Sequence, residues 1–197
     1  MTQDGYVIIE DALSADLALA LLAHFRSLDE GKFNRAGIGR EADFQVNAFI
    51  RTDEIHWLEG THPVTRNYFT RMEDLRRELN RRLFLGLFDY ECHYAWYPQG
   101  AFYKTHVDTF RGTDIRVIST VLYLNPNWSP GDGGELVLYR PDQGGILENI
   151  EPHFGRMVLF LSAEIPHEVL PVTAARYSIA GWFRKNNSQG AAIDPNR

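Results

Sequence analysis

His106 and Asp108 are separated by a single residue, which makes them the first candidates for chemistry in this chain. On an extended segment both side chains project to the same side and can bind one ion. His-x-Asp alone is a weak signal, but a second histidine, His167, follows far along the chain in SAEIPHEVLPV. Two histidines and one carboxylate on one face of an octahedron leave three open positions, as in non-haem Fe(II) oxygenases. The three residues therefore predict an iron site.

Arg176 follows His167 by nine residues and is the candidate for binding a second reactant. A chelating 2-oxo acid would occupy two of the open metal positions, and oxygen would occupy the third. The far carboxylate of 2-oxoglutarate then needs a buried cation, and a guanidinium meets a carboxylate through two parallel hydrogen bonds. An unpaired buried arginine costs on the order of several kcal/mol, so an inward Arg176 implies an anion as its partner.

Strand parity places further side chains around the same pocket. Arg176, Ser178 and Trp182 share one face of the last predicted strand, so they point inward together. On a middle strand Tyr123 shares a face with Ser119, and its phenol can give a second hydrogen bond to the same carboxylate. Two more tyrosines are candidates for the pocket wall: Tyr97 and Tyr103.

His93 shares strand parity with Tyr97 and can therefore face the same cavity. It supports the site or contacts substrate on one interpretation, and it is a simple packing residue on the other. Cys92 lies on the opposite strand face and is expected to be an unreactive core residue. Four further histidines lack a partner at ligand spacing and are expected at the surface: His24, His56, His62 and His153.

Two helical patterns precede these residues. Over residues 14–30 apolar side chains recur at spacings of three or four, with Ser14 as a plausible N-cap and Gly31 as a stop. Over residues 64–83 leucines and a methionine line one face, and charged residues fill the other. The basic segment RRELNRR, residues 76–82, is interpreted as the solvated face of this second helix.

After the second helix the apolar pattern changes to a period of two over residues 87–97, which indicates a strand. Helices followed by many short strands predict an α+β fold, a double-stranded β-helix (a cupin-like jelly roll) backed by the N-terminal helices. One domain is expected over residues 1–197, with helical support to about residue 85, a catalytic β-core over about 87–184 and a polar tail over 185–197. Four more strands are predicted, at residues 116–124, 135–139, 157–161 and 177–183.

Between the two predicted helices lies NRAGIGREADFQVN, which has weak periodicity. It is either a mobile loop or a β-hairpin, and a hairpin with a flexible tip is favoured. Residues 37–44, including Gly37 and Arg40, are expected to close over a substrate, because glycine permits backbone angles that other residues resist. An ordinary surface hairpin is the alternative.

Composition limits the partners and the compartment. The net charge of -6 disfavours nucleic acid as a partner, so a protein partner is expected. No run of about twenty apolar residues is present, which predicts no membrane span. The first residues are acidic rather than basic and the chain has a single cysteine, so export is not expected and a cytoplasmic location is inferred.

Several motifs together resemble the prolyl 4-hydroxylases of the SM-20 or hypoxia-inducible-factor type and their bacterial relatives. The resemblance is dense over about residues 88–184 and weaker in FIRTDEIHWLEG, residues 49–60. It rests on the segments WYPQGAFYKTHVD, VLYLNPNW, GGELVLY, IEPHFGRMVLFLS, PHEVLPV and ARYSIAGWF.

The resemblance implies roles for individual residues. It makes His106, Asp108 and His167 the iron ligands. It makes Arg176 and Tyr123 the partners of the C5 carboxylate of 2-oxoglutarate. It also implies a mobile segment at residues 37–44. The remaining matched positions are Tyr97, beside the metal-chelating end of 2-oxoglutarate, and Arg116 and Trp182, beside the substrate proline.

Departures from relatives refine this interpretation. Collagen-type members carry lysine at the position of Arg176, so this chain is more similar to the hypoxia-factor branch. Halogenating relatives lack the acidic ligand, whereas Asp108 is present here, which favours hydroxylation. Animal members often add a zinc finger, for which one cysteine is too few. A minimal enzyme of the bacterial type is implied.

The resemblance implies Fe(II), 2-oxoglutarate and O2 as cofactor and cosubstrates, with ascorbate as a possible rescuing reductant. Its expected substrate is a prolyl residue of a protein, such as elongation factor Tu or another translation protein, and a free amino acid or other small molecule is the alternative. Two other classes stay open: a zinc hydrolase with the same three ligands, and a cupin-like sensor without turnover. Oxygen uptake that depends on 2-oxoglutarate would distinguish an oxygenase from the zinc hydrolase and from the sensor.

Overall fold

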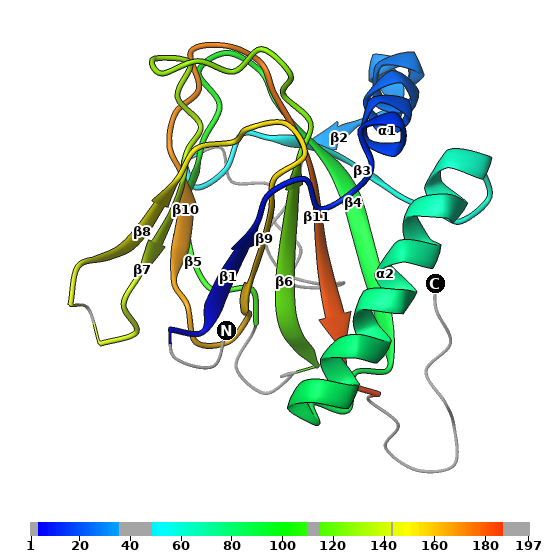
Figure 1. Ribbon diagram of the computed structural model, residues 1–197. Helices are drawn as coiled ribbons and strands as arrows, with labels where there is room; N and C mark the ends of the chain where they lie inside the picture. The colour runs from blue at the N-terminus through cyan, green and yellow to red at the C-terminus, as the bar shows by residue number, and fades with distance from the viewer. Residues whose placement is uncertain (1–3, 36–48, 110–114, 143, 187–197) are drawn as a thin grey trace.

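The chain folds into two antiparallel sheets that face each other, with two helices on the outside of the larger sheet (Figure 1). The computed structural model describes residues 4–35, 49–109, 115–142 and 144–186. The elements in chain order are β1 (Tyr6–Ile9), α1 (Ala15–Ser27), the 3-10 helix η1 (Glu30–Lys32), β2 (Asn34–Arg35), β3 (Glu54–Trp57), α2 (Pro63–Leu83), β4 (Asp89–Tyr97), β5 (Tyr103–His106), β6 (Arg116–Tyr123), β7 (Leu136–Tyr139), β8 (Ile146–Ile150), β9 (Met157–Leu161), β10 (His167–Val169) and β11 (Arg176–Arg184).

The strand order shows how distant parts of the chain meet. The larger sheet has the order β1-β9-β6-β11-β4-β3-β2, and the smaller has the order β5-β10-β7-β8. The last strand, β11, therefore lies between β4 and β6 at the centre of the larger sheet. In the smaller sheet β10 lies beside β5, and His167 is directly opposite His106. This α+β arrangement confirms the predicted jelly roll with helical support.

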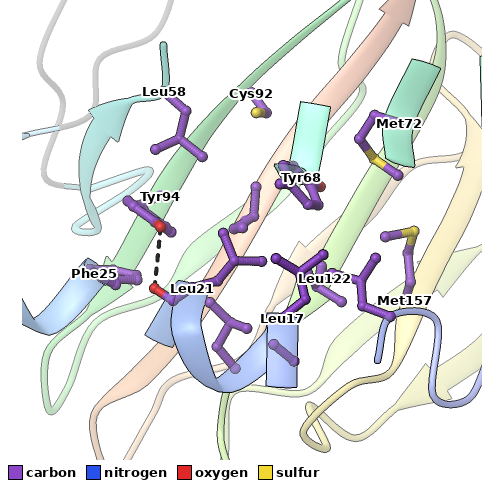
Figure 2. Close-up of a cluster of buried hydrophobic side chains, with 14 of the residues drawn as sticks. Leu17, Leu21, Phe25, Leu58, Tyr68, Met72, Cys92, Tyr94, Leu122 and Met157 are labelled. Atoms are coloured by element: carbon purple, nitrogen blue, oxygen red, sulfur yellow. Dashed lines mark hydrogen bonds between the residues drawn. The ribbon is translucent and has the colours of Figure 1, made fainter. Parts of the chain in front are cut away.

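The helices cover the outer face of the larger sheet through an apolar cluster (Figure 2). The side chain of Ser14 accepts a hydrogen bond from the Leu17 backbone N–H and caps α1, as predicted. Leu17, Leu21 and Phe25 of α1 pack over the sheet, and the hydroxyl of Tyr94 donates to the Leu21 carbonyl at 3.2 Å. The apolar face of α1 is thus buried against the outer face of the larger sheet, and this packing holds the helix and the sheet together.

The space between the two sheets holds a second cluster of apolar and aromatic side chains. Alternation along each strand decides which residues enter it. On β6, Ile118 and Leu122 face the helices, whereas Tyr123 faces the smaller sheet. On β11 the predicted parity is confirmed, since Arg176 and Ser178 are buried on the inner face. The site described below lies on this inner face.

The structure corrects several boundaries. The second helix and the five predicted strands are confirmed to within two residues, but α1 ends at Ser27 rather than at 30, so Gly31 lies in η1 instead of stopping the helix. The short strands β1, β3, β5, β8 and β10 were not predicted from the sequence. Of the predicted hairpin, only Asn34–Arg35 lies in the described part, where it pairs with β3. Among the described residues, no helix has the length and apolar character needed to cross a bilayer.

The expectation that His24 is a simple surface residue is wrong. Its ring stacks on His62 with centroids 4.1 Å apart, and its Nδ1 lies 3.0 Å from the Tyr94 hydroxyl. The Tyr94 hydroxyl already donates to a carbonyl, so His24 Nδ1 is the donor to Tyr94. His62 caps α2 by accepting from the Val64 N–H. The two helices therefore meet through a pair of imidazoles.

The environment of His24 predicts acid sensitivity. Partial burial lowers the pKa of His24, and the nearby His62, His56 and Lys32 lower it further. The unfolded chain then binds more protons at this residue, so its contribution to stability is full above about pH 6.5 and is lost as pH falls through the folded pKa. We expect the urea midpoint to fall between pH 7.5 and 5.5, and to fall less in His24→Asn. An identical decrease in both proteins would contradict this assignment.

Candidate active site

The three residues of the predicted His–Asp–His site lie close together in the structure. One ligand atom from each of His106, Asp108 and His167 lies within 4.8 Å of the other two. The two carboxylate oxygens of Asp108 lie at 3.6 Å from the imidazoles, with Oδ1 near His106 Nε2 and Oδ2 near His167 Nε2. The β5–β10 pairing produces this arrangement, because it places the two histidines side by side.

Hydrogen bonds orient both imidazoles for metal binding. His106 Nδ1 lies 2.8 Å from the Lys104 carbonyl, and His167 Nδ1 lies 3.1 Å from the Ile165 carbonyl. A carbonyl only accepts, so each Nδ1 carries the proton and each Nε2 presents a lone pair. Burial lowers the pKa of His167 to about 4, so this ring is neutral at neutral pH. Both rings are thus held in the tautomer that a metal ion requires.

Asp108 is held as a carboxylate by its neighbours. Burial alone would raise its pKa, but His167, His106 and the Ser119 hydroxyl together lower the pKa of Asp108 below its ordinary value. Ser119 Oγ donates to Asp108 Oδ2 at 2.6 Å and lies 2.9 Å from Ser162 Oγ. The Asp108 backbone N–H also donates to the Ser162 carbonyl. Sequence reasoning placed Ser119 on the correct face but missed its contact with Asp108.

Removing the Ser119 hydroxyl should weaken metal binding without removing a ligand. Partners that orient a ligating carboxylate typically affect metal affinity by about 10- to 100-fold. We expect Ser119→Ala to bind Fe(II) or Mn(II) more weakly by a factor in that range, as measured by calorimetry under anaerobic conditions. Ser27→Ala, which removes an exposed hydroxyl of α1, is the matched control and should bind as the wild type does. Equal affinity in both variants would show that Ser119 does not orient the ligand.

Arg176 forms the second half of the site. Its residue is only 2% exposed, and its Nη1 donates to Ser178 Oγ at 3.0 Å. Within the described residues no carboxylate lies within ion-pair distance of Arg176, and its Nε has no hydrogen-bond partner. A buried guanidinium without an anion is unstable, so this geometry indicates a carboxylate-bearing ligand. Ser178, which strand parity places beside Arg176, accepts this hydrogen bond and holds the guanidinium in position.

Two tyrosines surround the guanidinium of Arg176. The Arg176 Cζ lies 4.8 Å from the ring centre of Tyr97 and 5.1 Å from that of Tyr123. The Tyr123 hydroxyl is buried and has no hydrogen-bond partner in the described part of the chain. Burial raises the pKa of Tyr123 to about 12, so the phenol stays protonated and can donate. The side chains therefore converge as the sequence parity predicted.

A glycine makes room for this arginine. Gly134 has a φ of +78°, and a Cβ built there would lie 2.7 Å from Arg176 Cδ and 2.6 Å from a methyl of Val172. A larger residue at this position would therefore displace the guanidinium as well as strain the backbone. Sequence reasoning did not identify Gly134, because the close approach depends on how β11 lies against the turn before β7.

Tyr103 stacks on His106, one of the three candidate metal ligands. The two ring centroids are 3.5 Å apart. The guanidinium carbon of Arg51 also contacts Tyr103, at 4.2 Å from the ring centre. Arg51 forms a bidentate ion pair with the buried Asp53, at 2.8 and 2.7 Å. The sequence did not point to the Arg51–Asp53 ion pair, because these two residues do not form a pattern typical of metal ligands. Tyr103 thus supports His106 directly.

Arg116 and Trp182, the predicted neighbours of a substrate proline, lie together. The Arg116 guanidinium is 3.6 Å from the ring centre of Trp182, and two of its nitrogens donate to Glu91 Oε1 at 2.9 and 2.7 Å. Arg116 is therefore held in place by Glu91, and its charge is already neutralised by this ion pair. The other predicted substrate residues, Gly37 and Arg40, lie outside the described residues, and so does the whole predicted closing segment, residues 37–44.

The described residues fit a metal ion with a bound 2-oxo acid. The donor set of two imidazoles and one carboxylate suits Fe(II) and leaves positions open. The orphaned Arg176 Nε and Tyr123 hydroxyl supply the donors that a second carboxylate needs. On β6, Ser119 beside the metal ligand and Tyr123 beside the arginine are separated by about 13 Å of strand. A short dicarboxylic acid can connect the two halves.

Comparison with known proteins agrees with this geometry. The family described as the 2OG-Fe(II) oxygenase superfamily matches residues 92–184. A solved prolyl-4-hydroxylase from Pseudomonas putida is 42% identical, with a TM-score of 0.85, and the match covers 94% of this chain and 95% of that chain. A prolyl hydroxylase from Trichoplax adhaerens, solved with a hypoxia inducible factor peptide fragment, is 30% identical, with a TM-score of 0.79 and coverage of 93% and 85%.

Human Egl nine homolog 1 is 31% identical over 194 residues, which cover 93% of this chain and 44% of that protein. The chain spans about half the length of the Egl nine homologues that it matches. The Pseudomonas relative, by contrast, is covered almost in full at an identity well above 30%. The chain therefore belongs to the 2OG-Fe(II) oxygenase superfamily, whose members use Fe(II), 2-oxoglutarate and O2, and it is homologous to the prolyl hydroxylases of that family.

Proposed function

We propose that this chain hydroxylates a prolyl residue of a protein and converts 2-oxoglutarate to succinate and CO2. The observation that carries the proposal is the buried Arg176, which has no carboxylate partner in the described part of the chain and faces the same interior as the His–Asp–His cluster. A zinc hydrolase would leave this arginine without a role. A 2-oxo acid with a second carboxylate uses both features at once.

Each residue has a stated task in this proposal. His106, Asp108 and His167 hold the metal ion. Arg176 and Tyr123 bind the C5 carboxylate of 2-oxoglutarate, and Tyr97 and Tyr103 line its path toward the metal. When bound, the iron with 2-oxoglutarate and O2 supplies the oxidising power for inserting oxygen into a C–H bond. The protein fixes the geometry and limits access of water.

The choice of a protein substrate is supported by the relatives. The Pseudomonas putida relative is a prolyl-4-hydroxylase, and the Trichoplax adhaerens relative was solved with a peptide of a hypoxia inducible factor. The indole of Trp182, which packs against Arg116, is an aromatic partner that suits the ring of a proline. We infer that the substrate is a cytoplasmic translation protein, such as elongation factor Tu. Ascorbate would serve as an optional reductant. The whole chain would act as one domain.

Mass spectrometry of a native lysate tests the proposal. The lysate is treated with enzyme, Fe(II) and 2-oxoglutarate, and prolyl peptides that gain one oxygen are identified. Asp108→Ala is the control, and oxidation that occurs equally with this variant is discarded. Enzyme-dependent prolyl oxidation together with stoichiometric succinate supports the proposal. Succinate formation with free proline but with no protein target would favour the small-molecule alternative. No oxygen uptake with 2-oxoglutarate under any condition would favour a hydrolase or a sensor.

A further inference from the structure

His93 is a buried histidine that the proposed mechanism does not use. It lies on β4 and is 3% exposed. Its ring contacts Trp57 edge-on, with centroids 5.1 Å apart, and contacts Trp182 at 5.4 Å. Two tryptophans therefore fix the imidazole plane from different sides. A side chain held this firmly can present one ring nitrogen in a fixed direction.

The protonation state of His93 follows from its surroundings. Burial lowers the pKa of His93 to about 4, with a further lowering by the positive charge of Arg51. The ring is therefore neutral at neutral pH. Its Nδ1 lies 3.1 Å from the Tyr94 carbonyl, which only accepts, so Nδ1 carries the proton and Nε2 is a hydrogen-bond acceptor. Within the described residues no group donates to Nε2.

The strand register places His93 on the inner face, between the level of Arg176 and that of Ser119. Across the larger sheet His93 pairs with Ala180, and the next inward-facing pair on β11 and β6 is Trp182 with Ser119, the residue that contacts Asp108. Tyr97, opposite Arg176, is four residues further along β4, which is about 13 Å. His93 thus lies two inward-facing pairs from Arg176 and one pair short of the level of Ser119, on the side of β11 opposite to β6.

The surroundings of His93 suit a neutral polypeptide segment. Trp57, which contacts His93, is 49% exposed and forms part of the outer surface. The nearby charges are ion-paired, with Arg51 bound to Asp53 and Arg116 bound to Glu91. A charged group entering here would have to break one of these pairs. A neutral donor, such as a backbone N–H, meets an acceptor at no such cost.

We propose that His93 is a specificity-determining residue whose Nε2 accepts a hydrogen bond from a backbone N–H flanking the target proline, while Trp57 and Trp182 pack against the peptide. Proline itself has no N–H, so the donor belongs to a neighbouring residue. The inference rests on the proposed prolyl hydroxylation of a protein. It goes further by assigning a peptide contact to a residue that is neither a candidate metal ligand nor a proposed partner of the C5 carboxylate.

Steady-state kinetics with a synthetic peptide test this contact. The peptide is centred on the hydroxylated proline found by mass spectrometry, and each analogue is N-methylated at one backbone nitrogen beside that proline. We expect His93→Leu to raise KM for the peptide about tenfold, the effect of one hydrogen bond, with kcat and KM for 2-oxoglutarate nearly unchanged. His93→Gln keeps an acceptor and should restore much of the affinity. His56→Leu, on the neighbouring strand, is the matched control.

A double-substitution cycle separates a direct contact from altered packing. N-methylation at one of the two flanking positions should raise the wild-type KM about as much as His93→Leu does, and should add little in that variant. The ratio of wild-type to His93→Leu kcat/KM should stay constant from pH 6 to 8, because His93 is neutral throughout. Additive effects at every position, or an unchanged KM in His93→Leu, would overturn the inference. A wild-type enzyme that turns over no peptide would overturn the proposed function itself.

Discussion

Replacing His106 or Asp108 with alanine is expected to reduce 2-oxoglutarate turnover by at least about a hundredfold. Each change removes one of three protein ligands, which is a larger loss than removing a partner that only orients a ligand. Metal affinity should fall with the activity, as measured by calorimetry with Mn(II) or Fe(II) under anaerobic conditions. Succinate release gives the rate.

The fold should largely survive these changes. His106 lies on β5, an edge strand of the smaller sheet, and neither residue belongs to the apolar clusters that hold the sheets together. The metal-free thermal midpoints of the variants should therefore stay near that of the wild-type protein. His153→Ala, which removes a half-buried histidine paired with Glu151, is the control for loss of an imidazole. Normal turnover with iron in either ligand variant would show that the ligand assignment is wrong.

Replacing Arg176 with alanine is expected to raise the 2-oxoglutarate requirement far more than the iron requirement. The change removes charge-assisted hydrogen bonds worth about 1.5 to 3 kcal/mol each, which corresponds to at least a tenfold rise in KM. Tyr123→Phe should change KM in the same direction but less, since it removes a single neutral donor. Titration with 2-oxoglutarate at saturating iron measures both effects.

Arg176→Lys gives a matched comparison, because it keeps the charge but loses the planar pair of donors. We expect an intermediate KM for 2-oxoglutarate in this variant and an unchanged affinity for Mn(II). The cavity that Arg176→Ala leaves should not unfold the protein, because the guanidinium has no carboxylate partner among the described residues to lose. A similar loss of metal and 2-oxoglutarate affinity would instead indicate collapse of the inner face.

The sequence predicted the inner face of the central strands because parity is a local property. Side chains alternate at every residue, so placing Arg176 inward also placed Ser178 and Trp182 inward, and all three are buried there. The second helix was predicted for the same reason, since its apolar face follows a period of 3.6 residues. The short apolar strands β7 and β9 were predicted, whereas β3, β5 and β10 were missed because polar residues leave them too little apolar pattern to separate a strand from a turn.

The residue types and spacing of His106, Asp108 and His167, together with Arg176, determined the candidate chemistry of this protein. Only the tertiary structure decided which partners hold them, such as Ser119 on Asp108, Tyr103 on His106 and the pairing of His24 with His62. These contacts join strands and helices that lie far apart in the chain. Their register depends on how whole sheets and helices pack, and no spacing within one segment encodes it.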